Sequence, residues 1–339
     1  MHGLFFAFFS KISIINISLY FQEKINMELL QTREKIELLE QEIWKKIIGQ
    51  KKLIRDLMIG LFSWGHILLE WVPGLAKTLC VETLSKVVDL DYKRIQFTPD
   101  LLPSDLIGSK VFVNWKFSVK KWPIFANLVL ADEINRAPSK VQSALLEAMA
   151  ERQVTIWENT YKLDEPFMVL ATQNPLEQSG TYSLPEAQLD RFLLKTIVEY
   201  PTHSEELEIM KQYSNSNEVK LEKIFSKEEV LLLRKEIENV SISENIYEYI
   251  ADLVSLTRNK EFSEKYLAIW ASPRASIALV KSAKVFAFLE GRDFVLPEDI
   301  KEMLYPVFRH RIILSYEQIA EWMTTDKVID QILQNVTVK

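Results

Sequence analysis

Glycine is scarce in this chain of 339 residues. It occurs 8 times, about 2% of the residues, whereas soluble proteins average roughly 7%. Cysteine occurs once, as Cys80, which excludes an internal disulfide framework and fits a reducing cytoplasm. An excess of positive charge is also missing, since the net charge is −6. This balance excludes bulk affinity for nucleic acid or for an anionic membrane surface.

Long uninterrupted hydrophobic runs are lacking too. Residues 1–21 are apolar, but Lys11 interrupts them. The segment has neither the basic start nor the small-residue cleavage site of a signal peptide, and it is short and polar for a spanning helix. We interpret 1–26 as a spurious extension ahead of the true start at Met27, and expect a cytoplasmic protein without stable membrane insertion. The alternative is a membrane anchor.

What is present is an alternation of strands and helices, followed by helices alone. Short apolar runs predict buried strands at 66–70, 92–98, 127–133, 167–173 and 193–200. A helix with an apolar stripe follows Pro138, and 153–163 reads as a hairpin. The fold class is therefore α/β, with an α/β domain at 27–200 and a helical domain at 201–339.

The stretch HILLEWVPGLAKTL, residues 66–79, has the strand–loop–helix context of a phosphate-binding loop. Loop amides and the helix start would bind the phosphates of a nucleotide. Lys77 would reach the β- and γ-phosphates, and the Thr78 hydroxyl would bind Mg²⁺. The pattern GxxxxGK[ST] is imperfect, because Trp71 and Ala76 replace glycine. An ordinary strand–loop–helix turn is the alternative.

An acidic pair, Asp132 and Glu133, follows a buried strand some fifty residues after the Lys-Thr loop. This combination fits a nucleotide hydrolase, with Asp132 holding Mg²⁺ and Glu133 polarising the attacking water. A solvated pair at a strand end is the simpler interpretation of the two carboxylates alone.

Three further polar residues are candidates for the same site. Asn174 ends another strand and could contact the γ-phosphate or the water, although Asn-Pro is also a common turn signal. Arg191 could reach the nucleotide of a neighbouring subunit, or could simply pair with Asp190. Arg274 lies in the first turn of a helix, where positive charge is disfavoured, so phosphate binding would explain it.

Several segments together resemble the MoxR family of AAA+ ATPases, from about residue 28 to the C-terminus. The segments that carry the resemblance are IIGQ (47–50), the loop, 94–108, 123–156, 167–195 and ASPRA (271–275). The resemblance implies an αβα P-loop nucleotide domain, a C-terminal helical lid and an insert at 105–122. It also implies a ring oligomer, commonly a hexamer, that hydrolyses ATP with Mg²⁺ and remodels partner proteins, often with a von Willebrand factor A domain.

Site residues follow from the same resemblance. Glu133, Asn174 and Arg191 take the catalytic positions of the base, the first sensor and the trans-acting arginine. Thr78 and Asp132 are the metal ligands, and Arg274 is the sensor of the lid. The remaining nucleotide contacts come from the loop and the helix start: Pro73, Gly74, Leu75, Ala76, Lys77, Thr78 and Leu79.

Tryptophan stands where this family carries glycine. The positions are Trp64, Trp71, Trp122, Trp157, Trp270 and Trp322, and Trp44 and Trp115 also lie in turn-like settings. Such places favour positive φ or close backbone approach, which glycine supplies at least cost. We hypothesise that UGA codons for glycine were translated as tryptophan, which would make residues 71–78 GVPGLAKT.

Two other functions remain open. A DNA-acting or chelatase-type AAA+ motor would share every nucleotide motif, and Lys110, Lys116, Lys120 and Lys121 of the insert are compatible with one. A non-catalytic scaffold follows if Trp71 is genuine, because its ring would crowd the loop. His66 and His310 have no metal-ligand spacing, and Cys80 is expected to be a small core residue.

Overall fold

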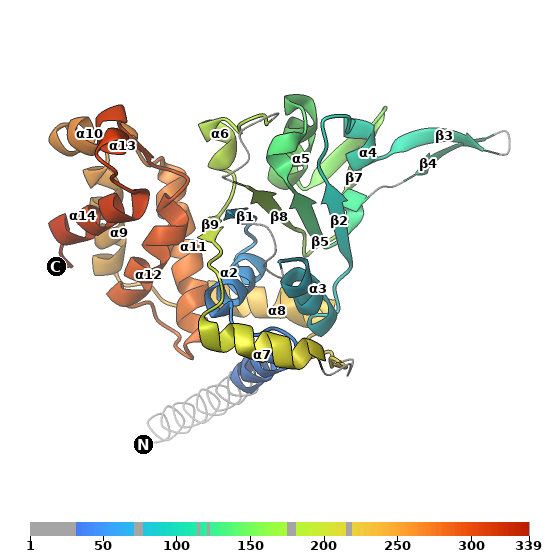
Figure 1. The fold of residues 1–339 in the computed structure, drawn as a ribbon, viewed down its shortest axis with the longest axis horizontal. Helices are drawn as coiled ribbons and strands as arrows, with labels where there is room; N and C mark the ends of the chain where they lie inside the picture. The colour runs from blue at the N-terminus through green and yellow to red at the C-terminus, as the bar shows by residue number, and fades with distance from the viewer. Residues whose placement is uncertain are drawn as a thin grey trace, which may run out of the picture.

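The computed structural model describes residues 32–70, 77–113, 116–120, 123–174, 181–214 and 219–338. A nucleotide-type domain with a central sheet lies on one side of the molecule, and a bundle of helices lies on the other (Figure 1). The expected order of an α/β half followed by a helical half is confirmed.

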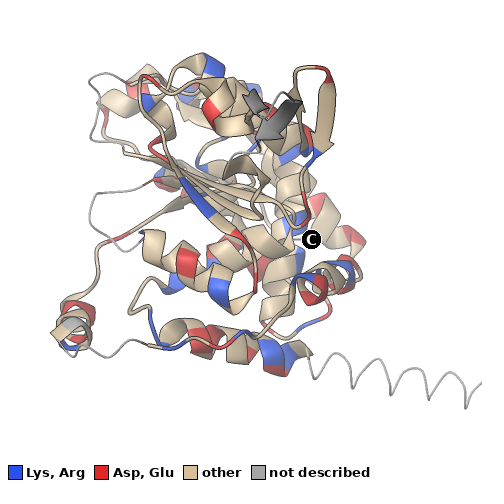
Figure 2. Cartoon of the chain, turned by 90° about the vertical axis from the view of Figure 1, so that its right-hand side faces the viewer, with Lys and Arg blue, Asp and Glu red and all other residues tan. Residues whose placement is uncertain are grey.

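Five parallel strands form the central sheet, in the order β2-β5-β8-β1-β9. All five coincide with the apolar runs of the sequence, and the predicted ends differ by three residues at most. Charged residues lie mainly on the outer helices rather than on these strands (Figure 2). The strands are β1 (Ile67–Glu70), β2 (Tyr92–Gln96), β5 (Leu128–Asp132), β8 (Met168–Gln173) and β9 (Leu194–Ile197).

Alternate residues of each strand enter two separate cores. Leu128 and Leu130 of β5 pack with Ile67 in one cluster, whereas Val129 and Ala131 join Leu68 in the other. This period of two is that of a sheet buried on both faces. The first cluster includes α2 (Lys51–Phe62) and α3 (Lys77–Val87), and the second includes α5 (Ser139–Glu151). The result is the expected αβα sandwich.

Two antiparallel hairpins extend from this domain. The expected insert contains α4 (Pro103–Ile107) and a hairpin of β3 (Ser109–Val113) and β4 (Lys116–Lys120), which projects far from the body (Figure 1). The second hairpin, β6 (Gln153–Ile156) and β7 (Asn159–Lys162), confirms the one predicted at 153–163. Its loop has two residues, because Ile156 pairs directly with Asn159.

The C-terminal half is helical apart from one short pair of strands, β10 (Leu267–Ile269) and β11 (Ile313–Leu314). The predicted capping box of Ser226 and Glu229 is present, and Ser272 caps Pro273–Leu289 as expected. The short helix α6 (Glu186–Leu189) precedes β9 and so belongs to the α/β half. The helices described after the sheet are α7 (His203–Ser214), α8 (Lys227–Glu238), α9 (Glu244–Leu256), α10 (Lys260–Tyr266), α11 (Pro273–Leu289), α12 (Pro297–Phe308), α13 (Tyr316–Ala320) and α14 (Thr325–Asn335).

The first helices after the sheet, α7 and α8, lie next to helices of the α/β half (Figure 1). Arg234 of α8 donates to the Leu61 carbonyl at 2.7 Å, and α7 and α8 lie below α2 and α3 in Figure 1. The domain boundary at residue 200 stays a prediction. Among the residues that the structure describes, no helix is both long and apolar enough to cross a bilayer.

Candidate nucleotide site

The Lys-Thr loop and the acidic pair meet at the carboxyl end of the sheet. Lys77 is the first residue of α3 and Asp132 the last of β5, and their side chains form an ion pair. Thr78 follows as the second residue of α3, so its hydroxyl lies at the same helix start. A carboxylate and a hydroxyl at the amino end of a helix are the donors that Mg²⁺ bound to phosphate takes in such sites.

Asp132 is 1% exposed and is held by three other side chains. Oδ1 accepts from Lys77 and from the Thr172 hydroxyl, the latter at 2.7 Å. Oδ2 accepts from Nε and Nη2 of Arg94, at 3.1 and 2.6 Å. Burial raises the pKa of Asp132, but these hydrogen bonds outweigh it and hold the pKa below its ordinary value. The carboxylate is therefore ionised at neutral pH.

Glu133 follows Asp132 in a left-handed backbone conformation, with φ 58°. Its amide donates to the Thr172 hydroxyl at 2.8 Å, and its Oε2 accepts from Gln96 at 2.8 Å and pairs with Arg136 at 3.1 Å. Positive φ is uncommon for a residue with a side chain and recurs at functional sites. The Glu133 carboxylate has partners different from those of Asp132, namely Gln96 and Arg136, so the two carboxylates can serve different parts of one reaction.

The remaining loop residues are only partly within the described chain. Pro73, Gly74, Leu75, Ala76 and Trp71 lie outside the described residues. Leu79 packs against the core beneath α3. Asn174 is 9% exposed and directly follows β8, the strand between β5 and β1. Its position beside the ends of β5 and β1 is the one that the sequence predicted.

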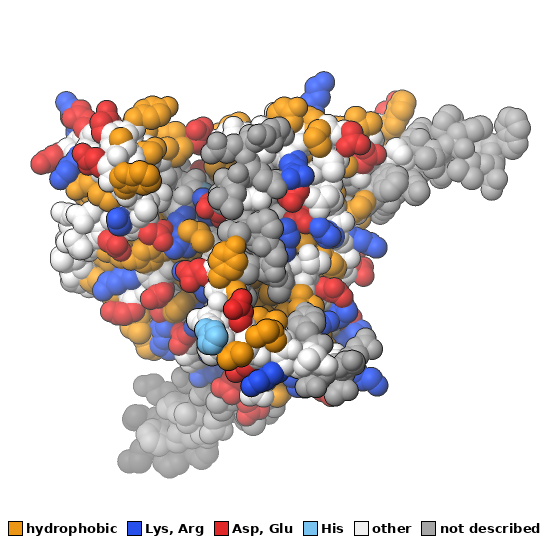
Figure 3. Space-filling model, in the orientation of Figure 1, with side chains coloured by type: hydrophobic (Ala, Val, Ile, Leu, Met, Phe, Trp, Pro, Cys, Tyr) orange, Lys and Arg blue, Asp and Glu red, His pale blue; other side chains and the backbone are white. Residues whose placement is uncertain are grey.

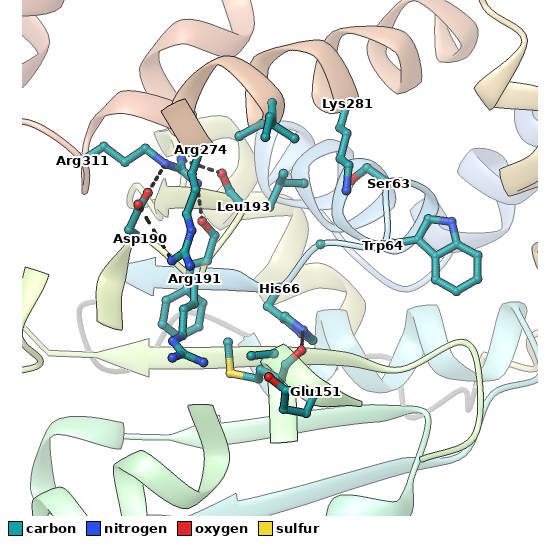
Figure 4. Close-up of a pocket in the computed structure, with 16 residues that line it drawn as sticks. Ser63, Trp64, His66, Glu151, Asp190, Arg191, Leu193, Arg274, Lys281 and Arg311 are labelled. Carbon is teal, nitrogen blue, oxygen red and sulfur yellow. Dashed lines mark hydrogen bonds and ion pairs between the residues drawn. The ribbon is translucent and has the colours of Figure 1, made fainter. Parts of the chain in front are cut away.

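Arg191 and Arg274 lie together at the opposite, amino end of the sheet. Arg191 precedes β9, whose Leu194 pairs with Ile67 at the start of β1. Both arginines line a cavity of about 350 Å³ between the sheet and α11 (Figure 4). Lys77, Thr78, Asp132 and Glu133 do not line it. The structure thus brings the candidate residues into two groups, one at each end of the sheet.

Asp190 connects the second group to the lid helices. Its Oδ1 accepts from Arg311 at 2.8 Å, its Oδ2 accepts from the Ser272 hydroxyl at 2.7 Å, and Arg274 lies 4.0 Å away. Burial lowers the pKa of Arg311 to about 10, although the Asp190 carboxylate favours the charged form. Asp190 therefore pairs with lid residues, while Arg191 donates to the Leu146 carbonyl at 3.0 Å. The suggested Asp190–Arg191 pair is not the arrangement that the described residues form.

The residues given a purely structural interpretation are core residues. His66 accepts from the Val169 amide through Nδ1 at 3.0 Å and donates through Nε2 to the Met149 carbonyl at 3.1 Å. Burial lowers its pKa to about 4, so it is neutral. His310 contacts the Phe192 carbonyl. Cys80 is 1% exposed and burial raises its pKa to about 12, which makes it a poor nucleophile.

Four residues of these networks were not identified from the sequence as parts of a site. They are Arg94, Gln96, Thr172 and, as a link to the lid, Asp190. Arg94 and Gln96 are two apart on one strand and so share a face, and that strand adjoins the one ending in Asp132. The two-residue spacing of Arg94 and Gln96 could have indicated that both face the site, but only once the order of the strands was known.

Comparison with known proteins assigns the chain to a family. Residues 66–194 match the family described as ATPase family associated with various cellular activities (AAA), and residues 260–332 match the AAA lid domain. Chaperone MoxR1 of Mycobacterium tuberculosis is 43% identical over 302 residues, which cover 87% of this chain and 80% of that protein. The uncharacterized protein YeaC of Bacillus subtilis is 42% identical, with 88% and 93% covered.

A crystal structure of a protein from Cytophaga hutchinsonii has the same fold. It superimposes with a TM-score of 0.89 at 51% sequence identity, covering 94% of this chain and 98% of that one. The AAA segment of this chain contains the Lys77–Asp132 pair, and its lid segment contains the partners of Asp190. The chain belongs to the MoxR family of AAA+ ATPases.

Proposed function

We propose that this protein hydrolyses ATP with Mg²⁺ and uses the reaction to remodel or activate partner protein complexes. The observation that carries the proposal is the convergence of Lys77, Asp132 and Glu133 at one end of the sheet, beside the amino end of α3. A buried ionised carboxylate, a lysine and a second carboxylate in this order are the groups that phosphoryl transfer to water needs.

Each residue has a separate task in this proposal. Lys77 and the amides of the loop bind the β- and γ-phosphates, and Thr78 and Asp132 hold the metal ion. Bound magnesium neutralises charge that develops on the phosphates. Glu133 accepts a proton from the attacking water, and Asn174 orients that water or the γ-phosphate. The Thr172 hydroxyl fixes Asp132 and the backbone of Glu133 at once.

Arg191 and Arg274 require a neighbouring subunit in this proposal. Both lie at the amino end of the sheet, away from Lys77 and Asp132 of the same chain. A ring would present this end of one subunit to the nucleotide of the next, so that Arg191 stabilises the charge of the transition state there. Arg274, beside it, would reach the same phosphates in trans. We propose such a homo-oligomeric ring, commonly six subunits in this family.

The proposed work of the ring is chaperone-like remodelling of a client, with a von Willebrand factor A domain protein as the expected kind of partner. The two hairpins of the nucleotide domain give it surfaces that can press on a client. A DNA-acting or chelatase-type motor is the second candidate, because Lys110, Lys116 and Lys120 lie on the β3–β4 hairpin. Against DNA binding, acidic and basic side chains are interspersed over the face shown in Figure 3.

Replacing Lys77 by alanine tests the nucleotide site directly. We expect the affinity for a fluorescent ATP analogue to fall roughly 10–100-fold, because a hydrogen bond from a charged group to phosphate is lost. Equilibrium binding by fluorescence, with phosphate release measured on the same samples, checks the result. The chain should begin at Met27 and be made both as printed and with glycine at the eight tryptophan positions.

The exposed Lys93 of β2, replaced by alanine, is the matched control and should bind nucleotide normally. If neither the chain as printed nor the glycine version binds ATP, even with Lys77 in place, the candidate site does not bind nucleotide. A non-catalytic scaffold is then favoured. If both bind it but release no phosphate, ATP is a ligand and not a substrate. Salt-sensitive binding of DNA by the unmodified chain would favour the motor instead.

A further inference from the structure

Helix α7 lies on the surface and buries none of its described side chains. Glu205, Ile209 and Gln212 form a half-buried stripe toward the loop before α2, and Gln212 donates through Nε2 to the Lys45 carbonyl at 2.9 Å. A helix of 12 residues is marginal in water by itself, and helices in proteins are stabilised mainly by the packing of an apolar face. The contacts within one chain give α7 little of that packing.

The apolar side chains of α7 are on its outer side. Leu207 and Met210 are three residues apart, so they share one face of the helix, and they are 40% and 60% exposed. Figure 3 shows hydrophobic side chains where α7 crosses the lower front of the molecule. Glu206 and Glu208, both exposed, flank Leu207 in the chain. The outer side of α7 is thus an apolar strip with acidic neighbours.

Helix α11 has an exposed face of the opposite charge. Arg274, Ile277 and Lys281 are spaced by three and four residues, so they follow one side of the helix. All three line the cavity at the amino end of the sheet (Figure 4), and Ile277 is 56% exposed. The helical rise over seven residues separates the two cations by about 10 Å along the axis. An apolar residue therefore lies between two positive charges.

Lys281 has no task in the site described above. Arg274 lies 4.0 Å from Asp190 and is assigned to phosphate, whereas no ion pair joins Lys281 to a residue that the structure describes. Figure 4 shows Lys281 apart from the group that contains Asp190, Arg191 and Arg274. An exposed isoleucine beside an exposed lysine has the composition of a protein interface, with an apolar centre and a charged rim.

The two faces lie at opposite ends of the sheet. Helix α7 follows the carboxyl end of β9, whereas the α11 face lines a cavity together with Gly65 and His66, which precede β1. One chain therefore does not bring its own two faces together. A contact between them joins two copies head to tail, and a contact of this kind forms a ring when its rotation closes.

Charge is complementary across such a contact. Helix α7 contains three glutamates and one lysine, and the exposed side of α11 presents Arg274 and Lys281 around Ile277. Opposite charges around an apolar centre favour one partner and one register. Contact of α7 with a second α7 would instead bring glutamates together, which is unfavourable.

We propose that α7 of one subunit docks on the α11 face of the next subunit. Leu207 and Met210 pack against Ile277 in this contact. Glu206 pairs with Lys281 at its edge. The inference rests on the proposed function, because it names the helices through which the subunits of the proposed ATP-hydrolysing ring meet.

The contact gives α7 a positioning role for the arginine in trans. Helix α11 carries Arg274 in its first turn and the docking residues one and two turns further on. Because a helix is stiff over this length, docking fixes how far Arg274 advances toward the phosphates bound by the neighbour. The hydrogen bond from Gln212 to Lys45 ties α7 to the chain just before α2, so this register is set by the α/β half of that neighbour.

Cross-linking with a short bis-maleimide tests the contact. One chain carries both Met210→Cys and Ile277→Cys, and its native Cys80 is only 1% exposed and so is protected from the reagent. In a head-to-tail ring each subunit is then linked to two neighbours. Denaturing gel electrophoresis should show a ladder of products that ends at the full ring. Chains with one of the two substitutions should stay single, because the contact is not symmetric.

Leu232→Cys combined with Ile277→Cys is the matched control. Leu232 of α8 is 57% exposed but lies outside the contact, so this pair should give no ladder. Cross-linking by Met210→Cys alone would mean that α7 meets a second α7, and would overturn the inference. A ring that forms without any ladder from the Met210 and Ile277 pair would leave α7 to another protein, and would overturn it as well.

Reversal of the ion pair tests the register of the two helices. Glu206→Lys and Lys281→Glu should each raise the chain concentration for half-maximal assembly roughly tenfold, because like charges then face each other. The double variant should assemble at nearly the concentration of the unmodified chain. Glu248→Lys makes the same change of charge at an exposed position of α9 and should assemble normally. Sedimentation velocity with an ATP analogue and Mg²⁺ measures all four. A double variant as weak as the single ones would show that Glu206 and Lys281 are not partners.

The outcomes separate this inference from the proposed function. An oligomer of the unmodified chain that gives no ladder refutes the docking of α7 and leaves the ring and ATP hydrolysis standing. Absence of any oligomer at every concentration of nucleotide refutes the proposed ring, and the inference with it. A ladder whose longest product matches the sedimenting species supports both.

Discussion

Glutamine in place of Glu133 is expected to stop ATP turnover while nucleotide binding persists. The substitution keeps the size of the side chain and one accepting oxygen but removes the charged group that accepts the proton of water. General base catalysis contributes roughly 10²–10⁴-fold in rate, and the loss should be of this order. Phosphate release under saturating ATP, together with equilibrium binding of a fluorescent ATP analogue, measures the two properties on one preparation.

A carboxylate outside the site serves as the control for this substitution. Glu165 is an exposed acidic residue paired with Arg152 on the domain surface, and Glu165→Gln should leave both binding and turnover unchanged. Turnover that survives Glu133→Gln within a factor of two would show that another group activates water. Loss of binding in Glu133→Gln would show that the variant disturbs the fold of the site and not only its chemistry.

Mixing two inactive variants is expected to restore hydrolysis if Arg191 acts on a neighbour. Arg191→Ala removes a charge from the transition state in every site of a uniform ring, and such arginines are worth roughly 10³–10⁵-fold in rate. Lys77→Ala weakens nucleotide binding and removes the lysine that contacts the transferred phosphate, but it keeps Arg191. In a mixed ring, an intact Lys77 site can face an intact Arg191, so turnover should return. Phosphate release as a function of the mixing ratio measures this.

The dependence of turnover on the mixing ratio distinguishes action in trans from action within one chain. If Arg191 acts within its own chain, each variant stays inactive in any mixture. The exposed Arg258 of the lid, which donates to the Ala271 carbonyl, offers a matched control, because Arg258→Ala should hydrolyse ATP without any second variant. Sedimentation velocity with and without ATP shows whether the mixed chains assemble at all, so a failure to assemble is recognised as such.

The strands could be predicted because each is a short apolar run that is buried on both faces. Their ends were less predictable. The strand predicted at 193–200 ends at Ile197, which pairs with Glu70, the last described residue of its partner strand β1. In the same way β2 ends at Gln96, the partner of Asp132. The length of a strand in a parallel sheet is set by the strand beside it, and the sequence of one segment does not show which strand that is.

The site was predictable as far as local motifs reach. Lys77, Asp132, Glu133 and Asn174 follow strands that lie next to one another in the sheet, and strand ends are where such sites form. Arg94 and Gln96 lack a local motif, and their contacts depend on β2 lying beside β5. Side chains that contact a site from a neighbouring strand can be identified only when the order of the strands is known.

The location of Arg274 at the opposite end of the sheet from Lys77 also could not be predicted from the sequence. In sequence Arg274 is one arginine near the start of a helix, and its task was inferred from its charge and from the family resemblance. In the fold it shares Asp190 with Arg311 and Ser272, which explains how a positive charge is tolerated at that helix end. The pairing joins residues more than eighty positions apart, beyond the reach of any periodicity.

Asp190 has one further consequence. It is adjacent to Arg191 in the chain, yet it is held by three residues of the lid. A lid that rotates when its own subunit binds or loses nucleotide would therefore carry Arg191 with it. In a closed ring this gives the signal a direction, because each subunit reports its occupancy to one neighbour and not to the other. The subunits would then hydrolyse ATP one after another around the ring, in one direction, and not all at once.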